Sequence, residues 1–240
     1  MNTPQAPFLE QVRGRLIVSV QADAGDPLDD PRILAAMARA VVRGGASALR
    51  ACQPVNIAAI RAAVDVPVIG LIKKSFPDSP VFITPTLADA RAVAAAGCAV
   101  IALDATLRPR PGGETLAWIV GELRKTTPAL LMADIATLAE GLAAAALGFE
   151  IISSTLSGYT AETAGRDPGR PDYDLIEALV RETGSRTAVI AEGRIWRPEE
   201  ARRLLDLGAH AVVVGTAITR PGSITRRFAG SLAPPHKPDF

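Results

Sequence analysis

Two side chains in this sequence have the types and positions needed to move protons. Lys73 directly follows the apolar run 68–72, and Glu192 directly follows the apolar run 189–191. A lysine that leaves an apolar strand into a partly dry cleft loses solvation of its ammonium, which lowers its pKa toward the roughly 7–8 that suits a base. A carboxylate that faces such a lysine can pass protons or hold a hydroxyl group. We therefore expect an acid–base pair, while a Schiff base, a surface lysine and a simple salt bridge are the competing interpretations.

Other polar residues stand at equivalent positions, each following an apolar run. They are Gln21, Arg50, Asp104, Asp134, Ser157 and Thr216. Arg50 could neutralise a developing oxyanion, and Asp134 adds a third acid. Taken singly, each could also mark only the point where a strand reaches solvent. Their repetition at so many strand ends is hard to explain by packing alone.

Two glycine-containing segments near the end of the chain indicate an anion site. Gly193 and Arg194 form the first, and the second contains Gly215, Thr216 and Arg220. Glycines permit close approach of the backbone, arginines supply charge, and phosphates bind to backbone amides at such loops. These features predict a phosphate site, although the glycines could serve only to shape the turns.

The elements that must position these residues alternate regularly between strand and helix. Apolar runs rich in β-branched residues predict eight strands, near 16–20, 48–51, 68–72, 100–103, 130–133, 151–155, 189–191 and 211–214. Helical segments include 30–43, 55–64, 87–96, 140–147, 173–183 and 198–207, and a final helix runs from 221 toward 228. The pattern predicts a single (β/α)₈ TIM barrel, whose active site lies at the carboxyl ends of its strands.

The helices are expected to close at glycines that take the left-handed conformation. These glycines are Gly44, Gly97, Gly148, Gly184 and Gly208. Residues 81–83 could add a short extra strand. An open doubly wound sheet is the alternative architecture, but it needs a glycine-rich nucleotide fingerprint after the first strand, which residues 21–23 lack.

Length and composition limit the other possibilities. A chain of 240 residues suits one barrel, which we assign to residues 1–230, with a solvated tail at 231–240. The 26 basic and 25 acidic residues argue against nucleic-acid binding, and two cysteines with two histidines argue against a disulfide framework or a zinc site. We expect no cofactor and no metal. Without a signal peptide or a long apolar segment, we also expect no membrane association and a cytoplasmic location.

Two polar segments have weaker assignments. Residues 108–111 alternate arginine with proline and are interpreted as a solvated turn. Residues 153–160 are rich in hydroxyl groups, which could line a sugar pocket or satisfy loop backbone. No Ser/His/Asp arrangement is visible.

Phrases in one order along the chain resemble the N-acetylmannosamine-6-phosphate 2-epimerase family of sialic acid catabolism, over about residues 11–229. They stand at 16–22, 69–74, 83–86, 101–106, 132–135, 155–160, 191–195 and 217–221. The resemblance implies interconversion of N-acetyl-D-mannosamine 6-phosphate and N-acetyl-D-glucosamine 6-phosphate, without a redox cofactor or a required metal.

The resemblance also implies roles for individual residues. Lys73 matches the catalytic lysine and Glu192 its partner carboxylate, while Gln21, Arg50 and Asp134 match sugar contacts. The residues that match the phosphate clamp are Gly193, Arg194, Gly215, Thr216 and Arg220.

Two departures from the family are visible. After Arg50 the family usually continues Ala-Gln-Gly, where this chain has Ala51-Cys52-Gln53-Pro54, and Ala136 stands where the family usually has serine. Another phosphosugar isomerase, a Schiff-base aldolase and a sugar-phosphate sensor without turnover stay as alternatives. Exposed apolar helix faces would also allow a homodimer.

Overall fold

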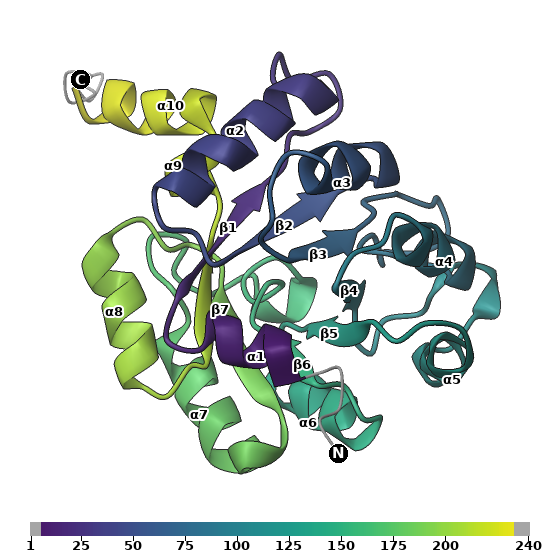
Figure 1. Ribbon diagram of the computed structural model, residues 1–240. Helices are drawn as coiled ribbons and strands as arrows, with labels where there is room; N and C mark the ends of the chain where they lie inside the picture. Colours follow the sequence, from purple (N-terminus) through teal and green to yellow (C-terminus); the bar gives the residue numbers. More distant parts are fainter. Residues whose placement is uncertain (1–5, 233–240) are drawn as a thin grey trace, which may run out of the picture.

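Eight parallel strands close into a barrel in the computed structural model, which describes residues 6–232 (Figure 1). The strands are β1 (Leu16–Val20), β2 (Ala48–Cys52), β3 (Val68–Leu71), β4 (Val100–Asp104), β5 (Leu130–Asp134), β6 (Ile151–Ser153), β7 (Ala188–Glu192) and β8 (Ala211–Val214). Strands adjacent in sequence pair with each other, and Ile17 of β1 is in register with both Ala48 of β2 and Val213 of β8. The predicted (β/α)₈ barrel is confirmed.

Strand boundaries differ from the prediction at a few places. Strand β6 ends at Ser153, because the chain turns there, and does not reach 155. Residues 81–83 form no strand; only an isolated antiparallel bridge joins Ile83 to Lys73. This segment meets the chain beyond the end of β3, so only one pair of residues bridges the two segments.

Helices follow the strands and surround the barrel (Figure 1). They are α2 (Pro31–Arg43), α3 (Pro54–Arg61), α4 (Leu87–Ala95), α5 (Leu116–Thr126), α6 (Leu138–Ala146), α7 (Tyr173–Thr183) and α8 (Pro198–Asp206). Side-chain caps begin several of them: Asp30 accepts from the amides of Arg32 and Ile33, and Thr137 with Glu140 forms a capping box. These contacts satisfy amides that the first turn leaves without partners.

Helix α2 ends at residue 43 as predicted, but the left-handed glycine that follows it is Gly45 and not the predicted Gly44. Gly44, which caps α2, is right-handed with φ −77°, whereas Gly45 takes the left-handed conformation with φ 105°. The sequence has two consecutive glycines here, and the second of them takes the left-handed conformation.

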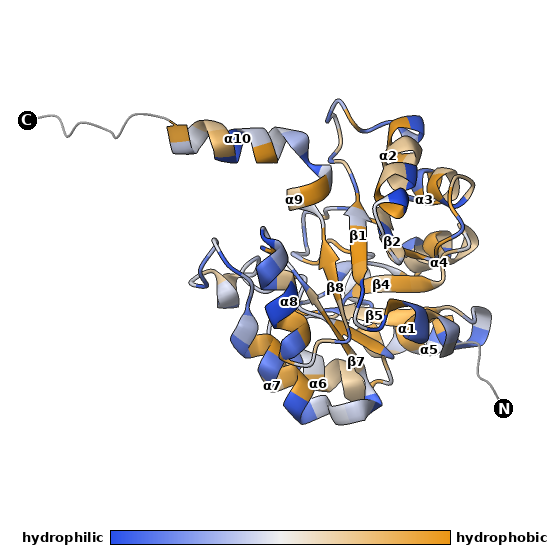
Figure 2. Cartoon of the chain, turned by 60° about the vertical axis from the view of Figure 1, so that its left-hand side comes forward, coloured by the Kyte–Doolittle hydropathy of each residue, from blue (hydrophilic) through white to orange (hydrophobic). Residues whose placement is uncertain are grey.

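The apolar core has two layers. Inward-facing residues such as Ile69, Met132 and Val213 fill the barrel, and outward-facing residues such as Leu49 and Ile101 pack beneath the helices. Figure 2 shows the apolar strands inside and polar residues on the outer helix faces. The layers follow from the two-residue alternation of side chains along each strand.

A short helix, α1 (Ala6–Val12), packs against the amino-terminal end of the barrel. Its Phe8 and Val12 are buried in the inner layer, and the Leu9 carbonyl lies 2.8 Å from Nε2 of His210. No prediction covered this helix. Because α1 covers the amino-terminal end, the barrel is open at the carboxyl ends of its strands.

The last elements are α9 (Thr216–Thr219) and α10 (Pro221–Leu232). The predicted helix near 221–228 is thus longer, and of the expected tail only residues 231 and 232 fall within the described residues, as the end of α10. Helix α10 has no buried residue and projects from the barrel (Figures 1 and 2). Between residues 6 and 232, no helix combines the length and the apolarity needed to cross a bilayer.

Candidate active site

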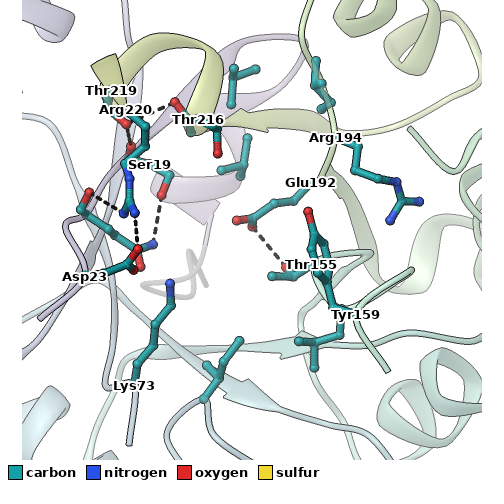
Figure 3. A pocket seen from close by; sticks show the side chains of 18 of the residues that line it. Ser19, Asp23, Lys73, Thr155, Tyr159, Glu192, Arg194, Thr216, Thr219 and Arg220 are labelled. Carbon is teal, nitrogen blue, oxygen red and sulfur yellow. Dashed lines mark hydrogen bonds and ion pairs between the residues drawn. The ribbon is translucent and has the colours of Figure 1, made fainter. Parts of the chain in front are cut away.

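A cavity of about 420 Å³ opens at the carboxyl ends of the strands, where the barrel predicts a site (Figure 3). Polar residues from five segments line it. They are Ser19 of β1 with Gln21 and Asp23 after that strand, Lys73 after β3, Thr155 and Tyr159 after β6, Glu192 at the end of β7 with Arg194 after it, and Thr216, Thr219 and Arg220 in and directly after α9. The cavity therefore brings together both members of the predicted acid–base pair.

Lys73 follows β3 and points into the cavity, as Figure 3 shows. Its side chain is exposed and does not lie in the partly dry cleft that the apolar strand led us to expect. The apolar run 68–72 is buried in the barrel wall, but Lys73 stands one step beyond it, at the open mouth. Among the described residues, the Lys73 amine has neither a hydrogen-bond nor an ion-pair partner, which leaves it free to meet a ligand.

Below Glu192 lies a buried ion-pair network. Arg50, whose side chain is 1% exposed, donates two hydrogen bonds to the Asp134 carboxylate, at 3.0 and 2.6 Å. Its Nη1 also lies 3.1 Å from Oε2 of Glu192, whose side chain is 14% exposed. Neither Arg50 nor Asp134 lines the cavity, whereas Glu192 does. The two predicted sugar contacts thus lie beneath the carboxylate that faces the ligand space.

This environment alters the titration of Glu192. Burial is the main effect and raises the pKa of Glu192, and the neighbouring Asp134 carboxylate acts in the same direction. The Arg50 guanidinium and a hydrogen bond from Thr155 oppose the shift without cancelling it. A glutamate with a raised pKa is suited to exchange protons near neutral pH.

The Thr155 hydroxyl joins the two carboxylates. It lies 2.7 Å from Oδ1 of Asp134, 3.1 Å from Oε2 of Glu192 and 2.9 Å from Oγ of Ser153. From the sequence, the hydroxyl groups of residues 153–160 could either line a sugar pocket or satisfy loop backbone. The signal that could have found Thr155 is its spacing, because it stands two residues beyond Ser153 and so faces the same way as that inward residue.

Gln21 presents an unsatisfied acceptor at the cavity. Its Nε2 donates to Oγ of Ser19 at 2.9 Å, while its buried Oε1 has no hydrogen-bond partner among residues 6–232. A buried carbonyl oxygen without a donor is costly, so a ligand N–H or O–H would be favoured there. This position fits the predicted role of Gln21 in binding substrate.

The two predicted phosphate loops lie side by side in the cavity wall. Gly193, with φ 107°, and Gly215 both line the cavity, as does Thr216 at the start of α9. A side chain at 215 would come within 3.1 Å of the Cβ atom of Ser19, so glycine allows the β8 loop to approach β1. At both glycines the cavity wall therefore consists of backbone without a side chain.

The two predicted phosphate arginines differ in direction. Arg220 forms an ion pair with Asp23, and this hydrogen bond lowers the pKa of Asp23. Arg194 points away from the cavity centre in Figure 3, and its Nε donates to the Arg170 carbonyl at 2.8 Å. Arg220 can therefore reach a bound anion by exchanging its partner, while Arg194 chiefly contributes backbone to the wall.

Some residues singled out at the strand ends are structural. Asp104 is fully buried and accepts hydrogen bonds from Thr106 and Arg108, and Ser157 donates to Asp172. The interpretation of 108–111 as a solvated turn is wrong for Arg110, which is 7% exposed and donates to the carbonyl oxygens of residues 84, 85 and 104. Its guanidinium is buried because three carbonyls replace its water.

Across the part of the chain that the structure describes, His, Cys, Asp and Glu side chains form no group of three suited to a metal ion. At the cavity, Lys73 and Glu192 have side chains of the types that can transfer protons, and the guanidinium group of Arg50 lies close to Glu192. A parallel eight-stranded barrel with these groups at the carboxyl ends of its strands defines a (β/α)₈-barrel enzyme.

Comparison with known proteins identifies the family. The family model described as "Putative N-acetylmannosamine-6-phosphate epimerase" matches residues 34–233. The chain belongs to this family, and it is a carbohydrate epimerase.

Relatives cover almost the whole chain. A protein of Enterobacter sp. (strain 638) named "Putative N-acetylmannosamine-6-phosphate 2-epimerase" is 49% identical over 93% of this chain and 95% of its own length. A protein of the same name from Lactiplantibacillus plantarum is 48% identical over 94% of this chain and 98% of its own.

Solved structures agree with the fold. The N-acetylmannosamine-6-phosphate 2-epimerase from Clostridium perfringens superposes with a TM-score of 0.89 at 44% identity, over 93% of this chain and 96% of that one. A thiamine phosphate pyrophosphorylase from Pyrococcus furiosus, at 16% identity and a TM-score of 0.56, shares the barrel alone.

Proposed function

We propose that the protein interconverts N-acetyl-D-mannosamine 6-phosphate and N-acetyl-D-glucosamine 6-phosphate. The observation that carries this proposal is the presence of Lys73 and Glu192 in one cavity, whose lining also contains Gly193, Gly215 and Arg220. The names of the relatives support the same substrate. The two sugars differ only in configuration at C2, so the chemistry required is the removal and return of one proton.

In this proposal the reaction begins with opening of the sugar ring. Glu192, aided by Asp134 through the buried network, takes the proton of the anomeric hydroxyl and passes it to the ring oxygen as the C1–O5 bond breaks, which exposes the aldehyde beside C2. Lys73, as a neutral amine, then removes the C2 proton. The charge of Arg50 stabilises the enolate-like intermediate from beneath the carboxylates, and Gln21 binds the sugar. Return of the proton to the opposite face completes the epimerisation.

The phosphate holds the substrate for this chemistry. Backbone amides of the Gly193–Arg194 and Gly215–Thr216 segments cradle it, and Arg220 neutralises its charge after leaving Asp23. General acid–base catalysis supplies roughly 10²–10⁴-fold, so positioning through the phosphate contributes much of the remaining acceleration.

The test is an epimerisation assay by proton NMR with the purified protein and two substrates, the 6-phosphate and unphosphorylated N-acetylmannosamine. The proposal expects conversion of the 6-phosphate to the gluco epimer and conversion of the free sugar at least about 100-fold less efficiently. No conversion of either sugar by folded protein would contradict it and favour a sensor. Borohydride in the presence of substrate separates the aldolase alternative, because it would trap an imine on Lys73.

We also retain three expectations from the sequence as proposals. They are a homodimer, a cytoplasmic location and independence from cofactors and nucleic acid. The exposed apolar residues of α10 support the first of these.

A further inference from the structure

The hydrogen bonds between β2 and β3 continue beyond the last paired residues. Cys52 is in register with Leu71, where both strands end. The Gln53 amide then donates to the Leu71 carbonyl at 2.9 Å, and the Gln53 side-chain Nε2 donates to the Lys73 carbonyl at 3.1 Å. One residue thus bonds two acceptors that are spaced like consecutive acceptors of a parallel ladder.

The side chain supplies this bond because the chain leaves the ladder directly after Gln53. Alternate residues of a parallel strand donate to the same neighbour, so the next donor would be Val55, which belongs to α3. Gln53 itself has φ 74° and ψ 135°, a conformation that turns the chain from β2 into α3 and that side-chain-bearing residues rarely adopt. Gln53 therefore holds an unfavourable backbone conformation while its amide reaches the segment that carries Lys73.

The Lys73 segment is held from two sides. On the side of residues 82–84, the Lys74 amide donates to the Phe82 carbonyl at 2.9 Å, and the Thr84 amide donates to the Ile72 carbonyl at 2.7 Å. On the β2 side, the Gln53 side chain donates to the Lys73 carbonyl, and the Cys52 thiol bonds the Lys73 backbone. Because the Lys73 amine has no partner of its own among the described residues, its place in the cavity depends on this backbone.

We propose that Gln53 is a positioning residue for Lys73, holding the lysine backbone through its side-chain amide at the cost of a strained φ. The proposal rests on the proposed function, in which Lys73 moves the C2 proton. It separates stability from activity in the variants of Gln53, because relief of the strain affects stability, whereas loss of the hydrogen bond affects the placement of Lys73.

Two variants separate the strain from the hydrogen bond. Gln53→Gly removes both, and Gln53→Ala removes the amide but keeps a Cβ at positive φ. We expect Gln53→Gly to melt about 2–6 °C above Gln53→Ala, because only glycine relieves the strain. We expect both to lower kcat about 10-fold and to leave KM within about 2-fold, because the lysine is misplaced while the phosphate site is intact.

Hydrogen exchange supplies a readout that needs no turnover. In both variants the amides of Lys73 and Lys74 should exchange about 5-fold faster than in the wild type, while β8 serves as an unchanged internal control. Wild-type kcat and unchanged exchange in Gln53→Gly would overturn the role of Gln53. A wild type without epimerase activity would overturn the proposed function instead, and the exchange rates would still decide whether Gln53 holds the lysine segment.

Discussion

Arg50 determines the charge balance of the cavity floor. Its guanidinium is shared by two carboxylates, with two hydrogen bonds to Asp134 and one close contact to Glu192. Glu192, nearer the ligand space, has the single contact, and burial together with the Asp134 carboxylate raises the pKa of Glu192. The floor separates the Arg50–Asp134 ion pair from a carboxylate that can exchange protons with a ligand.

This separation predicts a pH dependence. If ionised Glu192 takes the anomeric proton, kcat/KM rises as pH increases through its pKa, and the acid limb lies above the ordinary glutamate value of 4.5. Glu192→Gln should lower kcat/KM by about 10²–10⁴-fold and remove this limb from any residual activity. An unchanged limb in the glutamine variant would assign the titration to another group.

Thr155 should influence the same limb. Its hydrogen bond lowers the pKa of Glu192, so Thr155→Val should move the acid limb to higher pH and reduce kcat/KM at neutral pH about 10-fold. Thr155→Ser keeps the hydroxyl and serves as the control, with a profile close to that of the wild type. If valine leaves the profile in place, the hydroxyl has no role in the titration.

At this scale the sequence predicted positions better than contacts. Lys73 and Glu192 could be found because each follows an apolar run, and parallel strands bring such residues to one end. The burial of Arg50 could not be predicted, because it depends on which face of β2 points inward. Ala48 and Cys52, two residues to either side, both lie in the inner core, so Arg50 also points inward. Its partner Asp134 comes from a strand that only the closed barrel brings opposite.

Among the elements, the eight strands could be predicted from the sequence, whereas helix α1 could not. The eight strands could be predicted because buried parallel strands require continuous apolar runs. Helix α1 could not, because its seven residues have little intrinsic helical stability, and burial of Phe8 and Val12 against the barrel holds them.

Packing between β3 and the helices gives a test at the level of elements. A Cβ at Gly70 would lie 2.8 Å from Val93, 3.0 Å from Ile57 and 3.1 Å from Cys98. Gly70→Ala should therefore destabilise the protein by about 1–3 kcal/mol and lower Tm by about 2–10 °C. Calorimetry measures this effect. The control is Gly121→Ala, in the middle of α5 with open space around its Cβ, which should gain about 0.5–1 kcal/mol. Equal melting temperatures for the two variants would contradict the packing.

At the scale of the whole molecule, α10 projects from the barrel and buries none of its residues. Phe228 and Leu232 are 67% and 82% exposed, although Arg227 packs over the ring of Trp196, which lines the cavity. Exposed apolar residues on a projecting helix are typical of an interface, so we expect α10 to contact a second copy of the chain.

Light scattering tests this expectation. The wild type should have twice the chain mass of 25.0 kDa, and Phe228→Glu should shift it toward the monomer. Trp118→Glu, at an exposed apolar residue of α5, is the matched control and should leave the mass unchanged. A monomeric wild type, or a dimer that tolerates Phe228→Glu, would exclude this interface.

The most direct test of the proposed reaction is proton NMR of N-acetylmannosamine 6-phosphate in deuterated water. The comparison uses the wild type, Lys73→Ala and Lys74→Ala; Lys74 is the adjacent lysine, which pairs with Asp89 outside the cavity. The wild type and Lys74→Ala should yield the gluco epimer with deuterium at C2, and Lys73→Ala should yield neither product nor exchange. Conversion without deuterium at C2, or wild-type exchange by Lys73→Ala, would contradict proton transfer by Lys73.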